Sequence, residues 1–521
     1  SSSPPIHSNK ISVRLIQNAT GIMMKNYTSY DLIEWGKPFK KSQHALPEPS
    51  LSEVLIRVTA SVLCRSNLYV QKRKIAHYIM TILVMLFVLM AQGLPIAFAN
   101  ELSGRLIIVT SFPENVFNRF KSAFNERHPR IKIHVRSKKT SAAISFIQEA
   151  KGEPADILWA SAPDAFEVLK KSGHLEKVFR SKIKSNQHIL GYPVDDPAGY
   201  YRGFAISGYG IMWNRDYLNL HNLPEPRHWD DLRNPDYMGH IGISAPSRSG
   251  SMHLIIETIL QGKGWDEGWS TLMEIAGNLA TVTARSFGVL DGVKRGRFGV
   301  GPVIDFFGLS AIATGAPVGF TYSDATVFLP ANIALLKNGK NPDVAKAFVK
   351  FILSSEGQKI LLEPEISRLP IDPEIYLELP NGYPNPFDEN LTKKGIRFDT
   401  ELSRTRYHLV NNLFDIMITY RLRSLTKSWS IVREAESLVL KAEKISLVES
   451  LKEARRLISR VPVTANQAED PSFSSGFIRR RPGLPIPPNQ IVLEKKWEKF
   501  AKTNHLKAIN LVKETMEELT K

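Results

Sequence analysis

Residues 106–163 read LIIVTSFPENVFNRFKSAFNERHPRIKIHVRSKKTSAAISFIQEAKGEPADILWASAP. Apolar runs at 106–110, 131–135 and 156–160 are each followed by a turn rich in hydroxyl side chains and then by helical spacing. A strand, a turn and a helix repeated three times predict an α/β domain with a mainly parallel sheet. Ligands of such sheets bind beyond the carboxyl ends of the strands, where these turns lie.

Upstream of this domain, residues 71–99 have the parts of a secretory signal peptide in the right order. Basic residues at 72–74 precede an apolar run at 78–90, and Ala-Phe-Ala at 97–99 offers small residues at both positions that signal peptidase reads. The run is shorter than the ~20 residues of a membrane-spanning helix, so a retained anchor is the weaker alternative, as is a buried core helix. We expect cleavage after Ala99 and a periplasmic protein that begins at Asn100.

The chain has 521 residues, 68 Lys and Arg against 51 Asp and Glu, and a net charge of +17. The 422 residues from Asn100 to Lys521 are too many for one compact core and suggest two lobes and an appendage. The positive charge comes without a nucleic-acid-binding motif, so a solvated basic surface explains it and we expect no nucleic acid partner. The single cysteine, Cys64, lies before the signal peptide, so an exported product would have neither disulfides nor thiolate metal sites.

Residues 24–70 resemble the opening of the zinc-dependent alcohol dehydrogenases, in MKNYTSYDLIEWGKPF at 24–39 and SEVLIRVTA at 52–60. In that family a Gly-x-Cys-His-Ser-Asp turn follows, and its cysteine binds the catalytic zinc. Here Cys64 remains, but Val62, Arg65 and Asn67 replace the glycine, histidine and aspartate. We interpret residues 1–70 as an upstream fragment without function and expect it to bind no catalytic zinc. The alternatives are an unrelated leader and a working enzyme.

Five later segments resemble the extracellular solute-binding proteins of bacterial ABC importers, and among them the group of ferric-ion, hexose-phosphate and phosphoglycerate binders. The segments are IVTSFPE at 108–114, PADILWASAPDAF at 154–166, GYYRGFAISGYGIMWNRDYL at 199–218, HWDDLRNPDYMGHIGISAPSRSGSMHLI at 228–255 and NPDVAKAFVKFILSSEGQKIL at 341–361. They occur in the family's order, which makes the resemblance specific as a set.

The resemblance implies an α/β, two-lobed periplasmic-binding-protein-like fold (type II) that closes on its ligand like a hinged clamp. Lobe one would comprise residues 100–205 and 305–335, and lobe two residues 206–304 and 336–410. Hinge strands would cross at Gly203–Asn214 and return at Gly301–Phe307. Residues 411–521 would form a C-terminal helical extension, with helices at 425–461 and about 491–519, which either caps lobe two or docks a partner.

Hydroxyl side chains near helix N-termini are the first candidates for ligand binding, because unpaired backbone N–H groups there favour anions. Gly250 would let backbone approach a ligand. Ordinary helix capping is the alternative role for the serines around it. The candidates are Ser111, Thr140, Ser141, Ser161, Ser247, Ser249, Gly250 and Ser251.

Two charged residues complete the candidate set. Arg285 follows an apolar stretch and could present a fork to phosphate or carboxylate, or could be an ordinary surface arginine. Asp305 is expected within the returning strand, where a lone carboxylate is costly unless it faces the cleft or pairs with a lysine. His240 and His253 are expected to be structural.

The sequence contains no recognisable nucleophile–base motif, HExxH or P-loop, so we expect no enzyme, no cofactor and no metal. We expect instead a monomer that captures a small anionic solute, such as a phosphorylated sugar or an organophosphate, and delivers it to a membrane permease. The alternative ligand is a ferric ion, bound by a protein of the same fold. However, Asp305-Phe306-Phe307 stands where ferric binders have paired tyrosines, and Tyr200-Tyr201 lies much earlier. A periplasmic sensor for a membrane kinase is the alternative function.

Overall fold

The computed structural model describes residues 11–15, 26–32, 40–45, 102–149, 152–161, 163–178, 188–393, 395–478 and 485–520. The chain divides into two compact units, the second of which comprises Glu34–Pro38 and Ser103–Lys521. The first unit contains an antiparallel sheet of β1 (Ile11–Leu15), β2 (Asn26–Leu32) and β3 (Lys40–Ala45). Strand β2 lies within the stretch 24–39, whereas the predicted signal peptide and Cys64 lie outside the described residues.

The three predicted strand–helix repeats open the second unit. They are β4 (Gly104–Thr110), α2 (Glu114–Arg127), β5 (Ile131–Ser137), α3 (Thr140–Gln148), β6 (Ile157–Ala160) and α4 (Pro163–Lys171). Strand β4 pairs in parallel with both β5 and β6, as the sequence predicts. Its residues 106–110 are all buried, because helices cover both faces of a parallel sheet.

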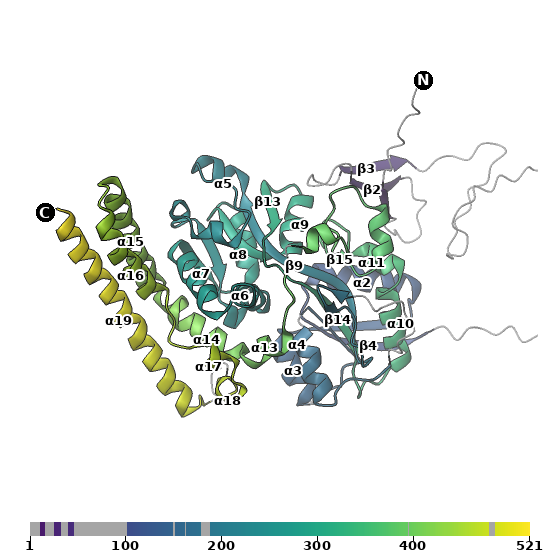
Figure 1. The fold of residues 1–521 in the computed structure, drawn as a ribbon. Coiled ribbons are helices and arrows are strands. Elements are labelled where there is room, and N and C mark those ends of the chain that lie inside the picture. The colour runs from purple at the N-terminus through teal and green to yellow at the C-terminus, as the bar shows by residue number, and fades with distance from the viewer. Residues whose placement is uncertain are drawn as a thin grey trace, which may run out of the picture. The chain divides into compact units, whose positions relative to one another are not determined.

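Strand β9 (Arg202–Asn214) is the long strand on which the sheet is built (Figure 1). Its first half pairs with β14 (Phe328–Leu335), and its second half pairs with β12 (Val300–Ile304) and β13 (Val318–Tyr322). Glycine is required at Gly210, where a Cβ would lie 2.0 Å from the Thr321 carbonyl oxygen. The predicted crossing strand at 203–214 is therefore confirmed.

We call β4, β5, β6 and β14 the β4 half, and β10–β13 the β12 half. In the β12 half, β10 (Ile241–Ser244) pairs in parallel with β11 (Leu279–Thr283) and β12. Its helices are α5 (Arg215–Leu220), α6 (Gly250–Lys263), α7 (Trp265–Gly277), α8 (Ser286–Lys294) and α9 (Asp305–Ala313).

The prediction of a return strand at 301–307 is wrong for residues 305–307, which are helical. Strand β12 ends at Ile304 and helix α9 begins at Asp305. The chain returns to the β4 half later, between β13 and β14, because β13 still pairs with the second half of β9. After the return come α10 (Pro342–Ile352), α11 (Ser355–Ile360) and β15 (Leu369–Pro370), which pairs with β9.

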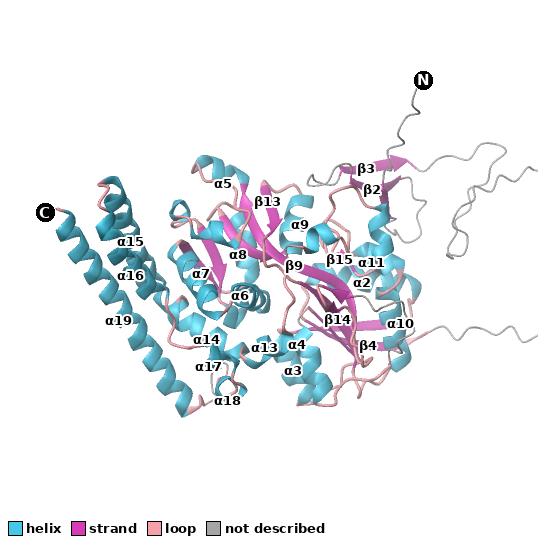
Figure 2. Cartoon of the chain, viewed as in Figure 1, coloured by secondary structure: helices cyan, strands magenta, loops and turns pink. Residues whose placement is uncertain are grey.

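The rest of the second unit is helical (Figure 2). The expected helix at 425–461 is in fact two helices, α15 and α16, because Glu443 between them has a left-handed φ of 55° that no α-helix accommodates. Helix α19 matches the predicted last helix. The bounds are α12 (Glu389–Thr392), α13 (Thr400–Thr405), α14 (Tyr407–Met417), α15 (Leu422–Lys441), α16 (Val448–Ser459), α17 (Ala465–Glu469), α18 (Pro471–Ser474) and α19 (Pro488–Leu519).

These C-terminal helices share one hydrophobic core with the β12 half. Trp429 of α15 is fully buried beside Gly277 of α7, where a Cβ would lie 2.6 Å from the indole ring. The Trp265 indole N–H donates to the Val463 carbonyl at 2.7 Å. The helices thus pack as a cap on this half. None of the helices in the described ranges is long and apolar enough to cross a membrane.

Candidate functional site

The carboxyl ends of β4 and β6 lie at one edge of the sheet, because Thr110 of β4 pairs with Trp159 of β6 in parallel register. Ser111 and Ser161 directly follow these strands, as predicted. The Ser111 hydroxyl is enclosed and has no hydrogen-bond partner among the described residues. An enclosed hydroxyl without a partner is costly, so this position favours a bound polar group.

The hydroxyl pair after β5 opens helix α3. Thr140 and Ser141 are its first two residues, and Thr140 is half-buried. The N-cap position is Lys139, whose side chain makes no capping hydrogen bond. The backbone thus places both residues at the N-terminus of a helix that follows a strand, the arrangement expected from the sequence.

Ser249 caps helix α6. Its hydroxyl accepts a hydrogen bond from the Met252 N–H at 3.1 Å and lies 3.2 Å from the Ser251 hydroxyl. Ser247 sits in the short 3-10 helix Pro246–Arg248, and a Cβ added at the exposed Gly250 would meet open space. The capping role is therefore present, and ligand binding by these residues stays a prediction.

Arg285 is exposed at the start of α8, with its guanidinium 5.7 Å from the Phe287 ring centroid. His253 is fully buried and contacts Asn411 and Ser403 at 2.9 and 3.3 Å, which supports a structural role. His240 lies 2.8 Å from the Tyr217 hydroxyl.

Asp305 is fully buried as the first residue of α9, not within a strand. Its carboxylate accepts hydrogen bonds from the Gly208 N–H at 2.6 Å, the Phe306 N–H at 2.7 Å and the Tyr322 hydroxyl at 3.1 Å. Burial raises its pKa to about 7, although these donors and Arg368 oppose the shift. Of the two alternatives for Asp305, pairing with a lysine is not found among its hydrogen bonds, which come from backbone N–H groups and a tyrosine, and contact with a ligand stays a prediction.

Arg368 is the residue that sequence reasoning missed. It is 1% exposed, and its guanidinium carbon lies 3.7 Å from the Phe306 ring centroid and 4.7 Å from that of Phe112. Its Nε and Nη1 atoms have no hydrogen-bond partner in the part of the chain that the structure describes. Burial lowers its pKa to about 10, and Asp305 counteracts this. The motif Ser-Arg-Leu-Pro carries no signal that would distinguish this arginine from a surface one.

Asp164, the second residue of α4, is another unassigned polar group at the β6 edge. Its Oδ1 atom is enclosed and has no hydrogen-bond partner within the described ranges. Burial raises its pKa to about 7, with Glu257 of α6 adding to the shift. The pKa of Tyr209 is raised by burial first, and then by the charges of Asp305 and Asp164. Asp164 and Asp305 therefore both lie close enough to Tyr209 for their charges to affect its pKa.

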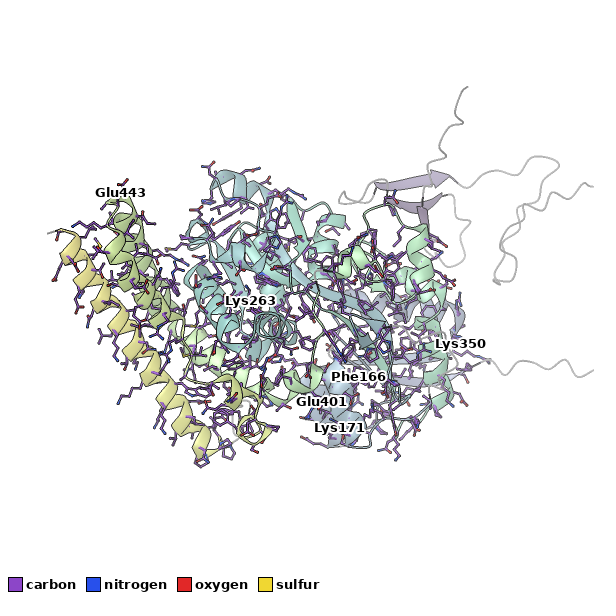
Figure 3. All side chains as sticks on the ribbon, viewed as in Figure 1. Phe166, Lys171, Lys263, Lys350, Glu401 and Glu443 are labelled. Carbon is purple, nitrogen blue, oxygen red and sulfur yellow. The ribbon has the colours of Figure 1, made fainter. Side chains whose placement is uncertain are left out.

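Side chains also connect α4 with α13. Lys171 of α4 forms an ion pair with Glu401 of α13 at 3.1 Å, and the two residues lie close together in Figure 3. Both are more than half exposed, so the pair contributes little stability. It does show that the segment leading into the C-terminal helices contacts the β4 half.

Within the described ranges, no group of three or more His, Cys, Asp or Glu residues could hold a metal ion. The hydroxyl of the buried Tyr201 donates to Glu167 at 2.6 Å, and burial raises its pKa above the ordinary range. This disfavours the phenolate that a ferric ion would need.

A surface hollow lies elsewhere, between the segment 224–237, α7 and α16. Its charged side chains largely pair with one another: Glu274 accepts from Arg233 at 2.9 Å and from Arg455 at 2.5 Å. Such mutual pairing leaves little free charge for a ligand.

The arrangement is that of a two-lobed α/β protein. Its two halves share strand β9, and polar groups without partners among the described residues lie where strands end and helices begin. A family model described as bacterial extracellular solute-binding protein matches residues 152–380. The phosphoglycerate transport regulatory protein PgtC of Salmonella typhimurium is 30% identical over 375 residues, which are 72% of this chain and 90% of that protein. The chain therefore belongs to the bacterial extracellular solute-binding proteins.

Solved structures agree with the fold. The periplasmic binding protein AfuA from Actinobacillus pleuropneumoniae, with fructose-6-phosphate bound, matches with a TM-score of 0.52 and 23% identity over 60% of this chain and 98% of that one. The substrate-binding protein of an ABC transporter from Agrobacterium tumefaciens matches with a TM-score of 0.50 and 17% identity, over 61% and 96%. The predicted two-lobed type II periplasmic-binding-protein fold with a C-terminal helical extension is thus confirmed.

Proposed function

We propose that this protein is the periplasmic solute-binding component of an ABC importer and takes a small anionic solute. The observation that carries the proposal is the enclosed Ser111 hydroxyl at the edge where β4 and β6 end, which has no partner among the described residues and can donate to an oxyanion. The Asp164 carboxyl oxygen at the β6 edge can accept from a hydroxyl group of the same solute. Such atoms gain most from a ligand with complementary groups. A phosphorylated sugar or an organophosphate is favoured by the ligands that the relatives' names carry, phosphoglycerate and fructose-6-phosphate.

In this proposal the two lobes close on the solute, and the closed form delivers it to a permease in the inner membrane. Two lobe limits of the sequence analysis change. The second crossing follows Tyr322 instead of preceding Asp305. Helix α10, expected in lobe two, packs on the β4 half, because Phe348 contacts Phe124 and Trp159 there. The protein acts as a monomer, binds no nucleic acid and catalyses no reaction.

Export in this proposal requires cleavage after Ala99, since residues 97–99 offer the small side chains that signal peptidase recognises. N-terminal sequencing of the exported protein should give Asn100. Recovery of an intact chain that contains Cys64 from the periplasm would contradict this part of the proposal.

A thermal-shift panel tests the ligand class, with each phosphorylated compound paired with its unphosphorylated form. Fructose 6-phosphate is compared with fructose, phosphoglycerate with glycerate, and ferric citrate with citrate. A ligand at 100 times its dissociation constant should stabilise the chain by about 2.7 kcal/mol. Stabilisation by ferric citrate alone would replace the anionic solute with the ferric alternative.

A sensor is the second candidate, because the relative's name describes a transport regulatory protein and the C-terminal helices extend beyond the shared sheet (Figure 1). As a sensor, the liganded chain would bind the extracellular part of a membrane kinase. Pull-down of membrane proteins with and without ligand separates the two: recovery of a permease supports transport, and recovery of a kinase supports sensing.

A further inference from the structure

Arg368 is a buried cation whose hydrogen-bonding capacity is partly unused. It is 1% exposed, and neither its Nε nor its Nη1 atom has a hydrogen-bond partner among the described residues. Buried charges are normally paired or fully hydrogen-bonded, because removing a charge from water is costly. An arginine in this state needs a compensating group.

Neighbouring protein groups compensate only in part. Phe306 and Phe112 place their rings 3.7 and 4.7 Å from the guanidinium carbon, which gives cation–π attraction but no hydrogen bond. Asp305 acts on Arg368 through its charge, yet its oxygens already accept from Gly208, Phe306 and Tyr322. Stacking leaves the N–H groups available, because they point outward in the guanidinium plane.

The position of Arg368 joins the two halves. Arg368 directly precedes β15, which pairs with β9 (Figure 1). Phe112 follows β4 in the β4 half, and Phe306 belongs to α9 of the β12 half. The guanidinium thus lies between the strand end of one half and the helix start of the other. Ser111, whose hydroxyl is also enclosed and unpartnered, is the neighbour of Phe112 in the chain.

We propose that Arg368, together with the Ser111 hydroxyl, binds the oxyanion of the solute. The ligand class is a small molecule with a phosphate ester or a carboxylate, which accepts from the guanidinium N–H groups while Phe112 and Phe306 hold the cation by stacking. The inference rests on the proposed function and assigns the anion-binding role in it to a residue outside the serine-rich helix starts.

The oxyanion completes the hydrogen bonds of a cation that contacts both halves, so its binding stabilises the arrangement in which Phe112 and Phe306 flank Arg368. The anion should therefore bind more tightly to the closed form than to the open one. A purely structural arginine, held by the two rings alone, would have no such dependence on ligand.

The test uses the full chain and titration calorimetry with phosphoglycerate and fructose 6-phosphate, with glycerate and fructose as the unphosphorylated partners. The variants are Arg368→Gln and Arg368→Lys. The matched control is Arg119→Gln, because Arg119 is partly buried and pairs with Glu363 at 2.8 Å. Melting temperatures without ligand report on folding.

We expect Arg368→Gln to weaken binding of the anionic ligand at least about tenfold, since charge-assisted hydrogen bonds are lost. Arg368→Lys should bind with intermediate affinity because it keeps the charge without the planar fork. The melting temperature of ligand-free Arg368→Gln should be equal to or above that of the wild type. The control should bind as the wild type does.

Comparing each phosphorylated ligand with its unphosphorylated form identifies the oxyanion that is bound. A loss limited to phosphorylated members identifies a phosphate contact, whereas an equal loss for phosphoglycerate and glycerate identifies the carboxylate. If Arg368→Gln binds the anionic ligand with wild-type affinity, whether or not its melting temperature is lower, the inference is wrong and the arginine is structural. If the wild type binds no anion at all, the proposed function itself fails.

Discussion

The ion pair between Glu257 and Arg406 should decide whether the C-terminal helices are a fixed part of this protein. Glu257 on α6 is fully buried, and Arg406, between α13 and α14, is 2% exposed. Arg406 donates to the Glu257 carboxylate at 2.9 and 3.0 Å and lies 5.1 Å from the Trp265 ring centroid. Arg406→Met would leave a carboxylate buried without a partner, which typically costs about 3 to 5 kcal/mol.

The assay is equilibrium unfolding in urea, followed by tryptophan fluorescence. Arg404→Met is the control, because Arg404 is 38% exposed and pairs with Glu401 on the same helix at 2.8 Å. Such a surface pair contributes about 0 to 1 kcal/mol. The double variant Glu257→Leu with Arg406→Met should recover most of the loss, since apolar replacement of a buried pair is often neutral.

A cost below about 1 kcal/mol for Arg406→Met, no larger than that of the control, would refute the reasoning. It would mean that water reaches Glu257 in solution, and hence that α13 and α14 are not held on α6 as the structure has them. A large cost that the double variant does not recover would point to lost packing against Trp265 instead of an unpaired charge.

Three further perturbations test separate parts of the molecule. Gly277→Ala should destabilise the chain by about 1 to 3 kcal/mol in thermal melts, because its Cβ would lie 2.6 Å from the Trp429 ring; an unchanged melt would mean that the cap is loosely packed. The folded-state pKa of Asp305 is raised from 3.8 to about 7, so its ionisation costs stability progressively as pH rises through this window. Asp305→Asn should therefore gain stability relative to the wild type between about pH 4 and pH 7, and a pH-independent difference in melting temperature would contradict the shift. Ser249→Ala should cost about 1 kcal/mol of stability through loss of the cap, and calorimetry on the double variant with Ser251→Ala shows whether these hydroxyls bind ligand as well.

The alternation of strands and helices was readable from the sequence because it is a local pattern. The apolar runs at 106–110, 131–135 and 156–160 became β4, β5 and β6, and the long apolar stretch at 203–214 became β9. Buried parallel strands need continuous apolar residues, and each of these strands has such a run in the sequence. The fold class therefore followed from the sequence and its family resemblance.

The end of a strand was harder to place. The run at 301–307 is apolar on both sides of Asp305, so nothing local separates a strand from a helix there. The helix start became visible only because the Asp305 carboxylate accepts from Gly208 on β9 and from Phe306 beside it. Contacts between distant segments fixed this boundary, and they cannot be read from spacing.

One of the two proposed binding residues could be predicted from the sequence, and the other could not. Sequence alone could nominate Ser111, since it follows an apolar strand and precedes a helix, a position with a local signature. It could not nominate Arg368, whose neighbours in the chain are unremarkable. Only tertiary structure buries this guanidinium between Phe112 and Phe306 and leaves its Nε and Nη1 atoms without a partner among the described residues, because burial and pairing are properties of residues brought together from remote parts of the chain.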